Sequence, residues 1–230
     1  MVIPVLVALD FASLTDAEAL ARRLLGKVAG FKVGLELLMG HGAEAVDRIA
    51  ILGAPVFADA KLHDIPNTVQ AAARQLASAG ARWLTVHGSG GDQMVAAAVT
   101  GMAEVTDGET GVLVVTALTS LDDEDLRAMG IAEPLTDHVV RMAEVARRGG
   151  AEGVVCSPAE ASLVKSRVPG LMVVTPGVRL TGGEFHDQRR VGTPRAALEA
   201  GSDLLVMGRA ITAATDPAAV VDRLAWELDR

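Results

Sequence analysis

Short apolar runs recur along the chain, and segments in which apolar residues have helical spacing separate them. The runs are rich in Val, Ile and Leu and end at Gly, Pro or a charged residue, which is typical of strands. There are eight: IPVLVALD (3–10), FKVGLEL (31–37), PVFADAK (55–61), WLTVHG (83–88), GVLVVTAL (111–118), GVVCSP (153–158), LMVVTPGV (171–178) and DLLVMGR (203–209). Helices are expected at 16–28, 43–49, 69–79, 92–104 and 137–148.

This alternation of strand and helix predicts an α/β fold with a parallel sheet covered by helices. Eight repeated units favour closure into a single-domain (β/α)8 TIM barrel that spans residues 1–230. An open dinucleotide-binding sheet is the weaker alternative, because the first strand ends in Asp10-Phe11 and not in a glycine-rich loop. HGSGGD (87–92) is only a weak candidate for a phosphate loop.

Several helix starts carry signals of their own. Two candidate capping boxes and two sites with proline at the first helical position are present. They are Thr15 with Glu18, Ser157 with Glu160, Thr193-Pro194 and Asp216-Pro217.

Composition narrows the class of protein. The net charge of −8 and the absence of Tyr argue against nucleic-acid binding, which needs a basic surface and often aromatic platforms. Every apolar run is interrupted within about ten residues, far short of the roughly twenty that a spanning helix needs. The start lacks a signal-peptide pattern, and the lone Cys156 can form neither an internal disulfide nor a cysteine zinc cluster. We expect a cytoplasmic protein without membrane or nucleic-acid partners.

Charged residues gather where the first three predicted strands end. Successive strand residues point to opposite faces, so Asp59 and Lys61 share the side of Phe57. The same parity turns Asp10 and Lys32 toward the interior of a barrel. Active sites of such barrels lie at the carboxyl ends of the strands, so these charges are expected to meet at one mouth, with Asp64 just beyond.

The flanking carboxylates restrict what Lys61 can do. Neighbouring acids favour the ammonium form, so Lys61 is expected to donate a proton and not to act as a Schiff-base nucleophile. A Mg²⁺ ion between Asp59 and Asp64 would compete with Lys61, so no metal is expected. The alternative is a structural ion-pair network, although partly buried ion pairs return little net stability.

An anion site is predicted at the eighth strand. VMGRAIT (206–212) places Gly208 and Arg209 between a strand and a helix, where many barrels hold a phosphate. The long segment 177–193 adds Arg179, Arg189 and Arg190, and a loop of that length is usually functional. The alternative is a glycine turn beside a solvated arginine.

DAKLHDIPNTV (59–69) carries the spacing Asp-x-Lys-x-x-Asp, which resembles the signature of the orotidine 5′-phosphate decarboxylase family. VALDF, FKVGLEL, VTALTS, VTPGVR, DQRRVGTP and VMGRAIT agree with that family in order and approximate spacing. Ala60 replaces a more usual Leu at a position expected to point away from the site.

The resemblance implies orotidine 5′-phosphate as substrate, UMP as product and a homodimer as the working unit. It implies that Asp10 and Lys32 contact the ribose, and that Lys32, Asp59, Lys61 and Asp64 form an alternating charge network. It further assigns Thr119 to the pyrimidine, Arg179, Gln188, Gly208 and Arg209 to the phosphate and closed loop, and Asp64 and Thr68 to the neighbouring subunit's site.

The mechanism that follows is electrostatic. Since the sequence has no thiamine or pyridoxal signature, we expect the Lys61 ammonium to stabilise the carbanion at C6 and then to protonate it, without a cofactor. Two alternatives stay open: a Mg²⁺-dependent sugar-phosphate decarboxylase or hexulose-phosphate synthase on a related barrel, and a catalytically silent barrel that binds nucleotides.

Overall fold

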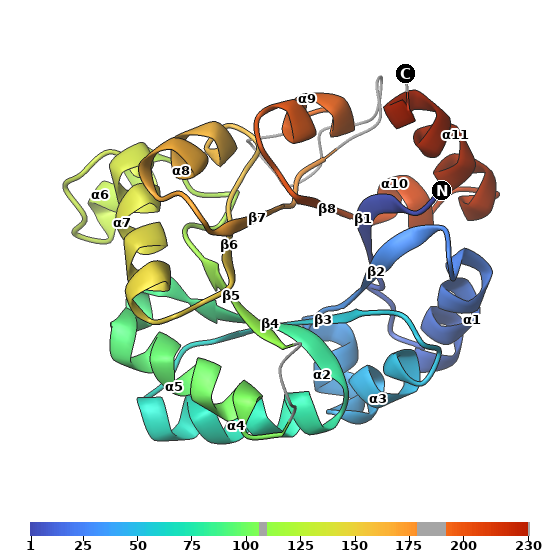
Figure 1. Cartoon of the computed structure of the whole chain (residues 1–230), viewed down its shortest axis with the longest axis horizontal. Helices are drawn as coiled ribbons and strands as arrows, with labels where there is room; N and C mark the ends of the chain where they lie inside the picture. Colours follow the sequence, from blue (N-terminus) through green and yellow to red (C-terminus); the bar gives the residue numbers. More distant parts are fainter. Residues whose placement is uncertain (106–109, 179–191, 230) are drawn as a thin grey trace.

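The computed structural model describes residues 1–105, 110–178 and 192–229. Within these ranges eight parallel strands pair in chain order, and β8 returns to β1 to close a barrel (Figure 1). The predicted (β/α)8 fold class is therefore confirmed. The strands are β1 (Ile3–Ala8), β2 (Val28–Val33), β3 (Val56–Leu62), β4 (Ala81–His87), β5 (Gly111–Val115), β6 (Gly153–Val155), β7 (Met172–Thr175) and β8 (Leu204–Met207).

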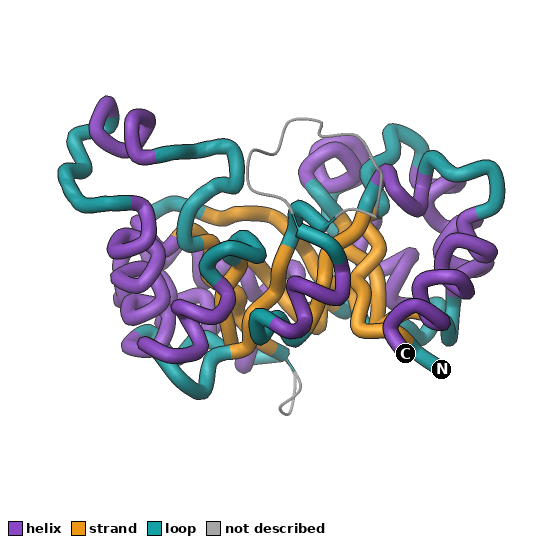
Figure 2. Tube along the Cα trace, turned by 90° about the horizontal axis from the view of Figure 1, so that it is seen from above, coloured by secondary structure: helices purple, strands orange, loops and turns teal. Residues whose placement is uncertain are grey.

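Helices surround the ring of strands (Figures 1 and 2). None in the described part of the chain is long and apolar enough to cross a membrane. They are α1 (Leu14–Leu24), α2 (Leu35–His41), α3 (Glu44–Ala50), α4 (Pro66–Ser78), the short 3-10 helix η1 (Gly88–Gly90), α5 (Gly91–Ala103), α6 (Asp123–Ala128), α7 (Leu135–Arg148), α8 (Ala161–Arg167), α9 (Pro194–Glu199), α10 (Arg209–Thr212) and α11 (Pro217–Asp229).

The five predicted helical segments all overlap helices, but two boundaries near β2 were wrong. The first predicted helix ran to Val28, whereas α1 ends at Leu24 and Val28 already begins β2. The run FKVGLEL is not one strand, because β2 ends at Val33 and α2 begins at Leu35. An apolar run that passes from a strand directly into a helix hides the boundary between them.

The proline signals mark helix starts correctly. Thr193 caps α9, since its hydroxyl accepts a hydrogen bond from the Ala196 N–H at 3.3 Å. Asp216 precedes α11 and accepts from the N–H groups of Ala218 and Ala219.

Neither predicted capping box marks the start of its helix correctly. Ser13, not Thr15, caps α1 and accepts from the Asp16 N–H at 3.2 Å. The Glu160 carboxylate does accept from the N–H and hydroxyl of Ser157, but α8 begins only after Glu160.

Side-chain parity divides the core into two layers. In β3, Val56 and Ala58 pack outward against the helices, whereas Phe57 faces the barrel interior. The interior cluster of buried residues consists of Leu6, Ala8, Phe57, Trp83, Leu113, Val174 and Val206. The alternation in β1 and β3 therefore confirms the predicted interior side of the strands that carry Asp10, Asp59 and Lys61.

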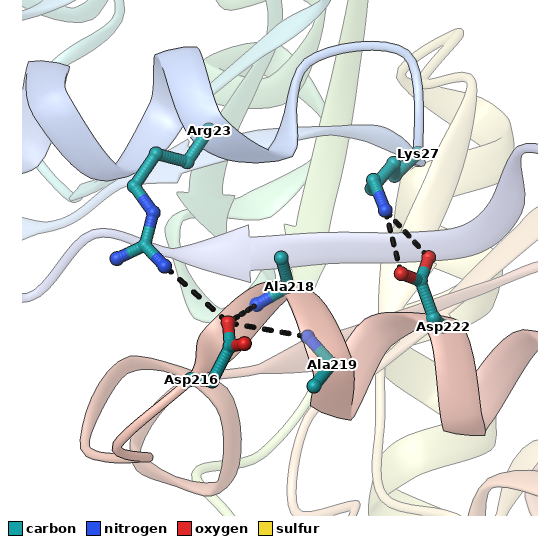
Figure 3. A network of polar contacts seen from close by, with 6 residues as sticks. All are labelled: Arg23, Lys27, Asp216, Ala218, Ala219 and Asp222. Atoms are coloured by element: carbon teal, nitrogen blue, oxygen red, sulfur yellow. Dashed lines mark hydrogen bonds and ion pairs between the residues drawn. The ribbon is translucent and has the colours of Figure 1, made fainter.

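The C-terminal helix α11 and the residue before it are tied to the end of α1 and the segment that follows (Figure 3). The Lys27 ammonium donates to both carboxylate oxygens of Asp222, at 2.6 and 2.7 Å. Arg23 donates to Asp216 at 3.3 Å. These contacts hold α11 beside the seam where β1 and β8 close the barrel.

Candidate active site

A cavity of about 260 Å³ opens at the carboxyl ends of the strands. Its charged lining comes from Asp10, Lys32, Asp59, Lys61 and Arg209. Its apolar lining includes Ala8, Phe57, Val115, Val155 and Val206. The mouth of the barrel thus combines a few charged groups with an apolar wall, as small-molecule sites usually do.

Four charged side chains form one alternating chain in this cavity. Lys32 Nζ lies 2.9 Å from Asp10 Oδ1 and 3.5 Å from Asp59 Oδ2. Lys61 Nζ lies 2.7 Å from the same Asp59 oxygen. Asp59 therefore pairs with two ammonium groups, accepting a hydrogen bond from Lys61 and forming an ion pair with Lys32, and the four predicted interior charges do meet.

The environment of Asp59 keeps its carboxylate ionised. Burial alone would raise the pKa of Asp59, whose side chain is 13% exposed. The charges of Lys32 and Lys61 and the hydrogen bonds donated by Lys61 and Thr85 outweigh burial, so the pKa lies below its usual value. A negative charge is thus maintained beside the Lys61 ammonium.

Lys61 also has an unusual backbone. Among the described residues it is the one non-glycine residue with positive φ, at 49°. The pairing of β3 with β4 is irregular here, between the Ala58–Leu84 and Leu62–Val86 pairs. Strained backbone is found preferentially at functional sites, where it aims a side chain.

Gly34 leaves room for the first ion pair. A Cβ atom built on Gly34 would lie 2.6 Å from Asp10 Oδ1 and 2.7 Å from Lys32 Nζ. Its φ of −92° is open to other residues, so glycine is required here for space and not for backbone geometry. In the sequence, the one sign of this role is that Gly34 lies two residues after Lys32 and is therefore expected on the same face of the strand.

The residues predicted to contact the pyrimidine and the phosphate fall partly within the described residues. Thr119, Gly208 and Arg209 line the cavity, beside Gly177. Arg179, Gln188, Arg189 and Arg190 lie outside the described residues. Val178 and Gly192, which flank that segment, pair with one another.

Asp64 and Thr68 do not line this chain's own cavity. Both side chains are exposed. The Asp64 carboxylate accepts a hydrogen bond from the Ile65 N–H at 2.7 Å, and Thr68 lies in the first turn of α4. Within the described single chain, Lys61 is therefore paired with Asp59, and no contact between Lys61 and Asp64 is seen among the described residues.

His87 ends β4 near this network. Its ring centre lies 5.6 Å from that of His63. Burial, the neighbouring His63 and the charge of Lys61 lower the pKa of His87, with a smaller opposing effect of Asp59. These surroundings disfavour the charged form of the His87 imidazole.

A (β/α)8 barrel with alternating charges at its mouth and an arginine beside the eighth strand fits the class of barrel enzymes that act on phosphorylated small molecules. Comparison of the sequence identifies the family. Residues 4–224 match the Orotidine 5′-phosphate decarboxylase / HUMPS family. The chain belongs to this family.

Individual relatives agree with that assignment. An orotidine 5′-phosphate decarboxylase of Anaeromyxobacter sp. (strain K) is 49% identical over 219 residues, which is 95% of each chain. One from Thermobifida fusca is 46% identical over 234 residues, covering 100% of this chain and 97% of the relative. The crystal structure of the enzyme from Lactobacillus acidophilus superimposes with a TM-score of 0.86 at 35% identity and covers 99% of both chains.

Proposed function

We propose that this chain decarboxylates orotidine 5′-phosphate to UMP, the last step of UMP biosynthesis, without a cofactor. The observation that carries the proposal is the Asp10–Lys32–Asp59–Lys61 chain inside the mouth of the barrel. It supplies an ammonium group, held by a buried carboxylate, next to a cavity that a nucleotide base can enter. The relatives described above are named orotidine 5′-phosphate decarboxylase.

The chemical step needs a charge stabiliser and a proton donor. When the bond between C6 and the carboxylate breaks, CO2 departs and the electron pair remains on C6. The Lys61 ammonium stabilises this charge and then transfers a proton to C6, giving UMP and a neutral amine that regains its proton from solvent. Asp59 fixes the position of the ammonium through the 2.7 Å contact.

Asp59 has a second role in the proposal. Its carboxylate is shared by Lys32 and Lys61 and lies at the cavity, where the substrate carboxylate is expected to sit. Two negative charges in contact raise the free energy of the bound substrate, and the loss of CO2 relieves the repulsion.

Phosphate binding provides energy away from the reacting carbon. Gly208 and Arg209 are proposed to hold the phosphate, with Arg179 and Gln188 from the segment 177–193, while Thr119 contacts the pyrimidine. Asp10 and Lys32 are proposed to bind the ribose. Binding energy from such remote groups can lower the barrier of the chemical step if it is realised mainly in the transition state.

The proposed working unit is a homodimer in which Asp64 and Thr68 complete the neighbouring site. Both residues are exposed at the mouth end of β3, away from their own cavity. Ile65, between them, is 67% exposed, and Leu35 after β2 is 45% exposed. Apolar side chains exposed beside polar functional groups are typical of an interface.

Complementation tests this arrangement. Lys61→Ala and Asp64→Ala chains are co-expressed with different tags and purified as a mixture. If each site combines Lys61 with the partner's Asp64, hybrid dimers regain one intact site, and the mixture recovers about a quarter of wild-type activity. Activity no greater than that of the two separate variants would contradict the shared site.

We also propose that the 230 residues form one catalytic domain that works in the cytoplasm. Cys156 is buried and is the one cysteine of the sequence, which is compatible with a reducing compartment.

The activity test follows the loss of absorbance when purified protein meets orotidine 5′-phosphate in the presence of EDTA. We expect turnover that survives exhaustive chelation, with Lys61→Ala as the matched inactive control. Turnover that requires added Mg²⁺, or activity on a sugar phosphate only, would favour a hexulose-phosphate synthase type of enzyme. Tight UMP binding without CO2 release would favour a silent nucleotide-binding barrel.

A further inference from the structure

Thr85 lies within β4 and is completely buried. It shares strand parity with Trp83, which belongs to the interior cluster, and with His87 at the strand end. Thr85 does not belong to the lining of the cavity. Any effect of Thr85 on the reaction must therefore pass through other residues.

Opposite Thr85, the register between β3 and β4 shifts. Between the Ala58–Leu84 and Leu62–Val86 pairs, β3 advances four residues while β4 advances two. The extra length of β3 contains Asp59 and Lys61. Regular parallel pairing is interrupted at these two residues, so their backbone groups need other hydrogen-bond partners.

The Thr85 hydroxyl meets both residues. Its oxygen accepts a hydrogen bond from the Lys61 backbone N–H at 2.9 Å, and the hydroxyl donates to Asp59 Oδ1 at 2.9 Å. The remaining Asp59 oxygen, Oδ2, accepts from the Lys61 ammonium. One hydroxyl thus fixes the backbone of Lys61, where φ is 49°, and also the plane of the Asp59 carboxylate.

We propose that Thr85 is a positioning residue that sets the Asp59–Lys61 pair in its reactive geometry. This inference rests on the proposed function, because it presumes that the pair carries out the decarboxylation. Thr85 acts without touching the substrate: it replaces the interrupted strand pairing with a side-chain bridge. Small displacements of a catalytic group lower the rate far more than they lower substrate affinity.

The charged surroundings of Asp59 provide a second way to detect this role. Lys32 and Lys61 face its carboxylate directly, Asp10 lies beyond Lys32, and His87 stands near Lys61. The Thr85 hydrogen bond adds to the lysine charges in holding the pKa of Asp59 low. Removing only the hydroxyl should raise that pKa, since the ionised form loses one donor.

The test compares Thr85→Val with Thr85→Ser. Valine keeps the branched shape and removes the hydroxyl, whereas serine keeps the hydroxyl and removes the methyl group. We expect Thr85→Val to lower kcat at least about tenfold, with KM and UMP affinity within about threefold of wild type. Thr85→Ser should stay within about threefold of wild type in kcat, a rescue that a purely packing role would not produce. Should the valine variant fail to fold, Thr85→Ala takes its place in the same comparison.

A carboxyl ¹³C titration supplies the readout that does not depend on turnover. The Asp59 signal, assigned with Asp59→Asn, should titrate at higher pH in Thr85→Val than in wild type, and at the wild-type position in Thr85→Ser. Wild-type kcat in the valine variant, equal impairment of both variants, or an unchanged Asp59 titration would overturn the inference. If wild-type protein itself fails to release CO2, the proposed function fails, while the titration still decides the role of Thr85.

Discussion

Two groups of ion pairs in this molecule consist of similar residues but differ in how far solvent reaches their side chains. At the mouth of the barrel, the central pair of Lys32 and Asp59 has side chains that are 10% and 13% exposed, whereas the outer partner Asp10 is 55% exposed. Beside α11, those of Lys27 and Asp222 are 38% and 62% exposed (Figure 3). The distances are similarly short, so geometry alone does not separate the two groups.

Solvent decides what each group can contribute. Exposed pairs contribute only about 0–1 kcal/mol, because water screens the charges and the side chains lose freedom. Buried pairs lose their hydration on folding and rarely improve stability over apolar residues. Under the proposed function, the mouth pairs serve catalysis, whereas the α11 pairs hold that helix in place. Mutations should separate these two roles.

The largest effect is expected for Lys61→Ala. Loss of both the proton donor and the charge stabiliser should reduce kcat by at least roughly 10³-fold. The melting temperature should change little, because Lys32 still neutralises Asp59 and the Lys61 side chain is 28% exposed. Steady-state kinetics and thermal unfolding of the same preparation measure both, and retained turnover would remove Lys61 from the mechanism.

Arg209→Ala should have the next largest effect. Loss of the cation at the proposed phosphate site should lower kcat/KM at least tenfold, which is about 1.4 kcal/mol. Orotidine, which lacks the phosphate, serves as the control substrate. Its turnover should be low in the wild type and should not fall further in Arg209→Ala. An equal loss with both substrates would place Arg209 in a different role.

Gly34→Ala probes the space around the first ion pair. The added methyl group would displace the ends of Asp10 and Lys32 and should lower kcat/KM by roughly three- to tenfold. Folding should be retained, because flexible side-chain ends can move and the φ of Gly34 suits alanine. Gly40→Ala in α2, where a Cβ meets nothing within 4 Å, is the matched control.

The smallest effect is expected at α11. Asp222→Ala should lower the free energy of unfolding by about 0.5 kcal/mol and leave kcat unchanged. Denaturant titration at low and at high salt measures it, and the difference from wild type should shrink as salt rises. A loss of several kcal/mol would show that exposure is a poor guide to the two groups of pairs.

The fold was predictable because strand–helix alternation repeats eight times and each apolar run is short. Parity then placed Asp10, Lys32, Asp59 and Lys61 inside the barrel, since a side-chain period of two needs no tertiary information. Other features needed the structure. The role of Thr85 depends on an irregular pairing between two strands, and WLTVHG reads as an ordinary strand.

The predicted ends of some helices and strands were wrong because the local sequence there fits more than one boundary. Ser13 and Thr15 are both good capping residues two positions apart, and only the backbone shows that Ser13 is the cap. Similarly, the apolar run after Phe31 fits a strand and a helix alike, so the start of α2 at Leu35 was missed.

The central claim is that the Lys61 ammonium is aimed at C6 of the bound nucleotide. A crystal structure of the protein with UMP tests it most directly. We expect Lys61 Nζ within about 3.5 Å of C6, still hydrogen-bonded to Asp59. An amine turned into bulk water, or another proton donor closer to C6, would contradict it.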